Sequence, residues 1–129
     1  QMLQRQINKV IKDADVVIVN PEHYAVALKY DLKKAKAPYV LAKGVDELAL
    51  YMKKLAASNN LEVVEMPPLA RAIYHTTKLD KEIPDGLFQA VALVLAYVFQ
   101  LKSYKAGRGA PPRELPKDKE MPIPDELRH

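Results

Sequence analysis

The sequence of 129 residues contains no cysteine and only four glycines. The absence of cysteine excludes disulfides and thiolate metal sites, and it fits a reducing compartment. The scattered glycines form no glycine-rich phosphate loop, which argues against a nucleotide-binding site. The sequence also lacks an internal repeat, a signal sequence and an apolar run of the roughly 20 residues that a membrane helix needs. We therefore expect one compact domain, large enough to bury a core without cross-links.

Side chains that hold metals or act as nucleophiles are few and far apart. The three histidines, His23, His75 and His129, lack a partner at ligand spacing such as HxxxH, so we expect no metal site and no cofactor. Ser58 and Ser103 lack the glycine-flanked turn that exposes the serine of a hydrolase. The sequence therefore disfavours an enzyme that acts on other molecules.

The hydrophobic pattern predicts an α/β domain with a mixed four-stranded sheet flanked by helices. β-Branched and alternating apolar residues predict strands at residues 16–19, 24–30, 39–43 and 61–66. Gly44 is expected to end the third strand, and Asp46 to cap the helix that follows and ends at Asn59-Asn60. This strand–helix–strand order predicts a parallel crossover. Further helices are expected at residues 1–13, 69–75 and 87–101.

Three regions are expected along the chain: a linker helix in residues 1–15, a globular domain in residues 16–106 and a flexible tail in residues 107–129. Half of the ten prolines fall within residues 111–129, among charged residues and without periodicity. Such a segment buries too little apolar surface to offset the entropy lost on ordering. We therefore expect the tail to be disordered.

The turn Asn20-Pro21-Glu22-His23 separates two apolar runs and is chemically unusual. Proline has no N–H with which to attack the asparagine side chain, so the reverse attack remains open. The Asn20 side-chain amide can attack its own carbonyl carbon, close a succinimide ring and expel Pro21 as an amine. His23 can exchange protons near neutral pH and lies two residues past that bond. The alternative is an ordinary turn, since Asn-Pro marks turns in many proteins.

Four stretches carry a family resemblance: NPEHYAVALKYD (residues 20–31), APYVLAKG (37–44), PPLARAIY (67–74) and IPDGLFQAVALVLAYVF (83–99). In them the sequence resembles the cytoplasmic domain of the FlhB/YscU family, the self-cleaving switch proteins of bacterial type III export, and most closely the flagellar branch. The usual motif of that family is Asn-Pro-Thr-His, so Glu22 stands where a threonine is expected. A hydroxyl that can donate is thus replaced by a carboxylate that only accepts when ionised.

The resemblance implies a flagellar export component that docks export substrates and switches export from rod and hook proteins to filament proteins. Self-cleavage between Asn20 and Pro21 would be a single event at the motif that also contains Glu22 and His23, without turnover of other proteins. The implied partners are export substrates, export chaperones, other export-gate membrane proteins and the hook-length control protein. The resemblance also implies a membrane-anchored parent protein, with this part on the cytoplasmic side of the bacterial inner membrane.

Five further residues have candidate binding roles through the resemblance. It implies an apolar contact surface for export substrates at Ala37, Pro38, Ala92 and Leu95. The other interpretation is that these residues only pack a strand edge against the last helix, which is apolar nearly all round. Arg71 matches a family motif and can bind a carboxylate or backbone carbonyls, whereas the alternative is a surface arginine on a short helix.

Two other functions stay open at this point. The net charge of +4 and the lysines around residues 29–36 fit a small basic nucleic-acid-binding module. No reading element or aromatic stacking platform is recognisable, so we expect no nucleic-acid partner. The second alternative is a docking domain of the same family in which Glu22 prevents cleavage.

Overall fold

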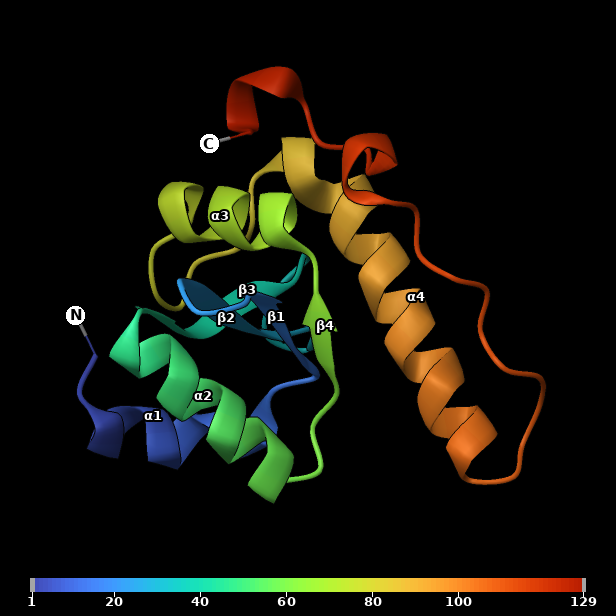
Figure 1. Cartoon of the computed structure of the whole chain (residues 1–129), viewed down its shortest axis with the longest axis horizontal. Coiled ribbons are helices and arrows are strands. Elements are labelled where there is room, and N and C mark those ends of the chain that lie inside the picture. Colours follow the sequence, from blue (N-terminus) through green and yellow to red (C-terminus); the bar gives the residue numbers. More distant parts are fainter. Residues whose placement is uncertain (1, 129) are drawn as a thin grey trace.

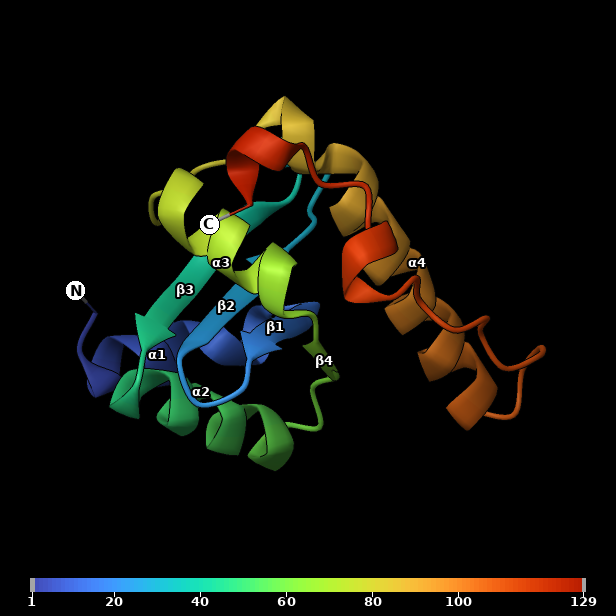
Figure 2. The same cartoon turned by 45° about the horizontal axis from the view of Figure 1, so that its top comes forward.

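A mixed four-stranded sheet forms the centre of the computed structural model, which describes residues 2–128. Its strands are β1 (Val16–Asn20), β2 (Tyr24–Lys29), β3 (Tyr39–Val45) and β4 (Val63–Glu65). They lie in the order β3-β2-β1-β4 (Figure 2). The β1–β2 and β2–β3 pairs are antiparallel and β4 is parallel to β1, so β4 also runs parallel to β3, as predicted.

Helices cover both faces of the sheet (Figure 1). In chain order they are α1 (Gln4–Val10), η1 (Ile11–Asp13), α2 (Glu47–Ser58), α3 (Pro67–Thr76), η2 (Asp85–Leu87) and α4 (Phe88–Lys105), where η marks a short 3-10 turn. Alternation along β1 divides the core in two. Val17 and Val19 pack with α1 and α2, whereas Val16 and Ile18 pack with α3 and α4. The predicted α/β class is confirmed.

The N-terminal helix packs onto the domain. Ile7 of α1 and Ile11 of η1 are completely buried and share one core with Val17 and with Met52 of α2. The segment that the sequence predicts as a linker thus contributes core side chains.

The link between β3 and α2 differs from the prediction at two residues. β3 continues through Gly44, where an added Cβ would lie 2.8 Å from the Cβ of Leu48, so glycine lets α2 pack directly on the strand. Asp46 precedes α2, but its side chain makes no capping hydrogen bond. The predicted cap is therefore wrong, because the backbone of Asp46 has a φ of 49° and not the extended conformation of a cap residue.

Residues 107–128 do not form a disordered tail. The segment runs back along α4 (Figure 1) and contains the 3-10 turns η3 (Asp118–Glu120) and η4 (Asp125–Leu127). Met121 and Ile123 are 2% and 5% exposed and belong to the core that α4 faces. Arg128 donates hydrogen bonds to the backbone carbonyls of residues 118, 121 and 123. The prediction is wrong because it rested on the average composition of the segment, which does not show that Met121 and Ile123 are buried. His129 lies outside the described residues.

Three different surfaces surround α4, which explains its nearly uniform apolarity. Val91, Val94 and Val98 are buried in the core. The tail covers a second side, where the Gln100 side chain donates to the carbonyl of Ala110. A third side is open and lines a groove. By length and composition alone, Asp85–Lys105 would also suffice to cross a membrane, contrary to the sequence expectation, but here it packs on the domain.

Candidate functional site

The motif at residues 20–23 forms a tight turn between β1 and β2. Asn20 and Tyr24 pair across the two strands, so the loop consists of the three residues between them. The N–H of His23 donates to the carbonyl oxygen of Asn20 at 3.0 Å. Pro21 fixes a negative φ at the second position and Glu22 has a φ of 81°, which together define a type II turn. Because this third position favours glycine or asparagine, Glu22 is held in a strained conformation.

The hydrogen bond across the turn falls on the carbonyl that the predicted reaction attacks. Negative charge develops on the oxygen of a carbonyl when a nucleophile adds to its carbon. The N–H of His23 already points at that oxygen of Asn20. The turn therefore supplies one preorganised donor for an oxyanion at Asn20.

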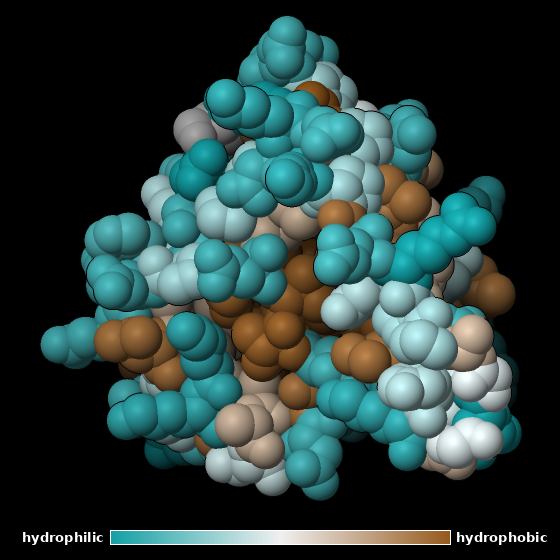
Figure 3. Space-filling view, turned by 45° about the vertical axis from the view of Figure 1, so that its right-hand side comes forward, coloured by the Kyte–Doolittle hydropathy of each residue, from teal (hydrophilic) through white to brown (hydrophobic). Residues whose placement is uncertain are grey.

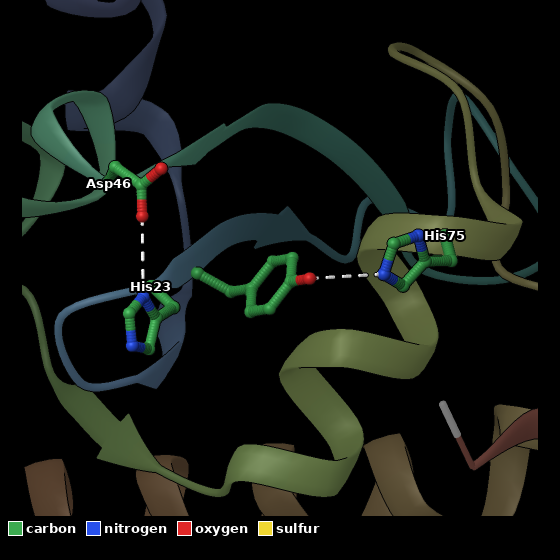
Figure 4. A network of polar contacts seen from close by, with 4 residues as sticks. His23, Asp46 and His75 are labelled. Carbon is green, nitrogen blue, oxygen red and sulfur yellow. Dashed lines mark hydrogen bonds and ion pairs between the residues drawn. The ribbon is translucent and has the colours of Figure 1, made fainter.

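The imidazole of His23 has an acidic neighbour that the sequence did not indicate. Its Nδ1 lies 3.3 Å from Oδ1 of Asp46, and the second ring nitrogen is turned away from that contact (Figure 4). The N–H of Asp46 also donates to the carbonyl oxygen of His23 at 3.0 Å. The two side chains are 65% and 72% exposed, so the ring is accessible to solvent.

The strand register separates Asn20 from His23. Because Asn20 lies opposite Tyr24, their side chains share one face of the sheet, the face on which Tyr24 packs toward α3. His23 instead contacts Asp46, at the beginning of α2. The register of a three-residue hairpin loop would have indicated Tyr24 as a neighbour. No local signal indicates Asp46, which is 23 residues away in the sequence.

A polar and aromatic cluster lies on the Tyr24 side of the turn. The Tyr24 hydroxyl is 3.3 Å from Nε2 of His75 (Figure 4), and the rings of Tyr24, Tyr74 and His75 have centres 5.2 to 5.5 Å apart. Nζ of Lys43 donates to the carbonyl oxygens of Tyr74 and Thr77 at 2.8 and 2.9 Å, at the C-terminus of α3. Desolvation by burial lowers the pKa of Lys43. The cluster thus holds the end of α3 beside β3 and β2.

The four residues predicted as an apolar contact surface line one groove of about 370 Å³. Ala37 and Pro38 come from the loop before β3, and Ala92 and Leu95 come from α4. The groove is also lined by Tyr30, Lys36, Phe88, Ala96 and Phe99. Apolar side chains gather in a hollow on the side of the molecule that carries α4 (Figure 3). The structure brings the four residues together, and their binding role stays a prediction.

Ala92 and Leu95, the two α4 residues predicted from the sequence to contact substrates, differ in burial. Leu95 is 5% exposed and belongs to the core, whereas Ala92 is exposed. Leu95 therefore serves the packing role that the sequence left as an alternative, and it also forms part of the groove wall. Arg71 is half-buried on α3 and does not line the groove.

Within residues 2–128, the structure brings no three histidine or acidic side chains together as a metal site would require. His23 and His75 contact different partners, Asp46 and Tyr24. The third histidine of the sequence, His129, lies outside the described residues.

Residues 1–98 match the family described as FlhB HrpN YscU SpaS. The flagellar biosynthetic protein FlhB of Salmonella typhimurium is 41% identical over 124 residues, which are 96% of this chain and 32% of that protein. The crystal structure of the cytoplasmic domain of FlhB from Shewanella putrefaciens is 55% identical, with a TM-score of 0.93 over 98% of this chain and 96% of that chain. The mutated EscU C-terminal domain with an asparagine-to-alanine change is 32% identical, with a TM-score of 0.68 over 70% of this chain and 90% of that chain.

The chain spans about a third of the length of the curated relatives that it matches. The EscU structures include substitutions at one asparagine and at the proline that follows it, the pair that Asn20 and Pro21 form here. The family match, the sequence identity and the shared fold agree with the resemblance inferred from the sequence. The chain therefore belongs to the FlhB HrpN YscU SpaS family, and its fold is that of the cytoplasmic domain of flagellar FlhB.

Proposed function

We propose that this domain acts in flagellar type III protein export as a switch that cleaves its own backbone between Asn20 and Pro21. The observation that supports this most strongly is the type II turn, in which the carbonyl of Asn20 accepts a hydrogen bond of 3.0 Å from His23. That carbonyl is the electrophile of the proposed reaction. The turn holds it in a fixed geometry beside the only side chain that can close a five-membered ring on it.

The proposed reaction conserves atoms and protons. The side-chain nitrogen of Asn20 forms a bond to its own carbonyl carbon, and the resulting oxyanion is stabilised by the N–H of His23. The bond from this carbon to the nitrogen of Pro21 then breaks. One proton leaves the amide nitrogen and one is added to Pro21, so the products are a C-terminal succinimide and a new N-terminal proline.

We assign the proton transfer to His23, whose ring is accessible and lies on the side of the turn away from the Asn20 side chain. From there it is better placed to protonate the leaving nitrogen of Pro21 than to contact the amide directly, and water can connect the two steps. Glu22 is also exposed and lies one residue from the scissile bond, so its carboxylate is a second candidate proton acceptor.

The two fragments should remain associated after cleavage. β1 belongs to the first fragment and pairs with β2 and β4 of the second. Ile7, Ile11 and the four residues Val16–Val19 are buried against the second fragment's elements or its core. Cleavage therefore frees the turn without dissolving the domain, and this is the change that we propose as the switch from rod and hook export to filament export.

We further propose that export substrates or their chaperones dock in the groove formed by Ala37, Pro38, Ala92 and Leu95. Each buried methylene contributes about 0.8 kcal/mol, so a short apolar segment would bind weakly and reversibly. Arg71 is a separate candidate contact on α3. The parent protein would be anchored in the inner membrane with this domain on its cytoplasmic side, near other export-gate proteins and the hook-length control protein.

The proposal is tested by following newly translated chains over time on denaturing gels. The parent chain should convert to two fragments, and His23→Ala should slow the conversion by about 10²–10⁴-fold because general acid–base catalysis is lost. In cells, full-length protein with Asn20→Ala should export rod and hook proteins but not filament proteins. Normal filament export by that variant would contradict the switch. A parent chain that never converts would instead favour the non-cleaving docking domain.

A further inference from the structure

Asp46 combines two unfavourable features at one position. Its φ of 49° and ψ of −114° lie in a region that glycine adopts freely and that other residues adopt at a cost. It also stands directly before α2, where an aspartate normally stabilises a helix by accepting hydrogen bonds from its first turn. The Asp46 side chain makes no such bond. Local structure alone therefore gives no reason for this residue to adopt this conformation.

Both features coincide with contacts to His23. The backbone N–H of Asp46 donates to the His23 carbonyl oxygen at 3.0 Å, and its Oδ1 lies 3.3 Å from Nδ1 of the ring (Figure 4). Within residues 2–128, Asp46 is the acidic side chain that lies within ion-pair distance of His23. The backbone contact fixes where the carboxylate sits, and the side-chain contact fixes which ring nitrogen faces it.

We propose that Asp46 is a positioning residue for the self-cleavage, an inference that rests on the proposed function. Its carboxylate accepts a hydrogen bond from Nδ1–H of His23, which leaves the electron pair of the neutral ring on Nε2. Nε2 is then the nitrogen that takes up, through water, the proton released from the Asn20 amide and delivers a proton to the nitrogen of Pro21 as the C–N bond breaks. No net proton is gained or lost.

A purely stabilising role does not account for the contact. Both side chains are more than 60% exposed, and exposed ion pairs contribute little to stability. Glycine at position 46 would relieve the backbone strain and remove the carboxylate. Stability and cleavage should therefore respond in opposite directions, whereas a structural role would lower both.

The test compares cleavage rates and thermal midpoints of three variants with those of the parent chain. Asp46→Gly should cleave about tenfold more slowly, a typical loss for an orienting partner, without a lower thermal midpoint. Asp46→Asn should keep most of the rate, because its amide oxygen still accepts a hydrogen bond from Nδ1–H. Asp80→Gly is the matched control. Asp80 also has a positive φ, of 63°, but its backbone N–H donates to the carbonyl oxygen of Val40 in β3 and not to the turn, so the cleavage rate should not change.

Two further measurements separate this inference from the proposed function. In His23→Ala, adding Asp46→Gly should cause no further loss, because Asp46 acts through His23. In uncleaved Asn20→Ala protein, imidazole ¹⁵N shifts should report the Nδ1–H tautomer of His23, and Asp46→Gly should abolish that preference. If Asp46→Gly cleaves at the rate of the parent chain, or if the tautomer of His23 is unchanged in it, the inference is wrong. The proposed function would still stand if His23→Ala cleaves slowly. A parent chain that does not cleave would overturn both.

Discussion

The carbonyl oxygen of Asn20 accepts a hydrogen bond from the backbone N–H of His23 at 3.0 Å. The bond closes a loop of three residues, and one of these, Glu22, has a φ of 81°. A donor on the carbonyl of the proposed cleavage site and a strained residue thus belong to the same turn. Cleavage of the Asn20–Pro21 bond would release the strain at Glu22, so the turn itself favours the reaction that we propose.

The strain at Glu22 can be measured in a background that does not cleave. In Asn20→Ala protein, Glu22→Gly should raise the free energy of unfolding by about 1 kcal/mol, because glycine adopts a positive φ without strain. The measurement is chemical denaturation of both proteins. Glu65→Gly in β4 is the matched control and should lower stability by about 0.5–1 kcal/mol. A loss of stability in Glu22→Gly would show that the turn is not strained there.

Charged substitutions at Ala92 and Leu95, two of the α4 residues that line the groove, should have different effects. Ala92→Asp should change the free energy of unfolding by less than about 0.5 kcal/mol, since the residue is exposed, yet weaken the binding of an apolar export-substrate peptide. Leu95→Asp should lower the free energy of unfolding by about 3 kcal/mol or more, because the substitution removes core packing and buries a carboxylate. Thermal melts and peptide titrations check both. Unchanged binding to a folded Ala92→Asp protein would mean that substrates bind elsewhere, with Arg71 and the lysines around residues 29–36 as the next candidates.

The tail can be tested at one of its buried residues. Met121→Ala should lower the free energy of unfolding by about 2–3 kcal/mol, because Met121 is 2% exposed and packs in the core beside α4. Glu120→Ala, at the exposed neighbouring position, should have an effect within about 0.5 kcal/mol. Denaturant titration of both variants is the measurement. Equal effects would mean that the tail does not dock in solution.

The lowered pKa of Lys43 predicts a rise of stability at alkaline pH. Below its folded-state pKa, Lys43 is charged in both states and adds no pH dependence. Between that pKa and about 10.4, the unfolded chain binds the proton that the folded protein has released, so unfolding becomes less favourable as pH rises. The free energy of unfolding relative to Lys43→Met should therefore increase over this window. A constant or falling difference up to pH 10.5 would contradict a desolvated lysine.

Local patterns were sufficient for most of the fold. β-Branched and apolar runs identified the strands, because β1 and β2 are short segments whose residues are buried on both faces of the sheet. The parallel direction of β4 also followed from the helix between it and β3. The predictions that were wrong depend on how the helices and the tail pack in three dimensions. Gly44 was predicted to end β3 because its packing against Leu48 is visible only once α2 is placed.

The candidate site divides in the same way. The proposed cyclisation depends on two adjacent residues, Asn20 and Pro21, so it could be predicted from the sequence alone. The neighbours Tyr24 and Asp46 required the strand register and a contact across 23 residues. The docking of Met121 required the position of α4, which no composition rule for residues 107–129 can supply.

The most direct test of self-cleavage is the intact mass of freshly purified protein under denaturing conditions. Self-cleavage predicts two fragments whose masses correspond to residues 1–20 and 21–129, a new N-terminal Pro21, and a single species on a native column. Asn20→Ala, folded and purified in the same way, should give one unbroken chain. A parent chain found only at full length, or an Asn20→Ala protein broken at the same bond, would contradict self-cleavage by the Asn20 side chain.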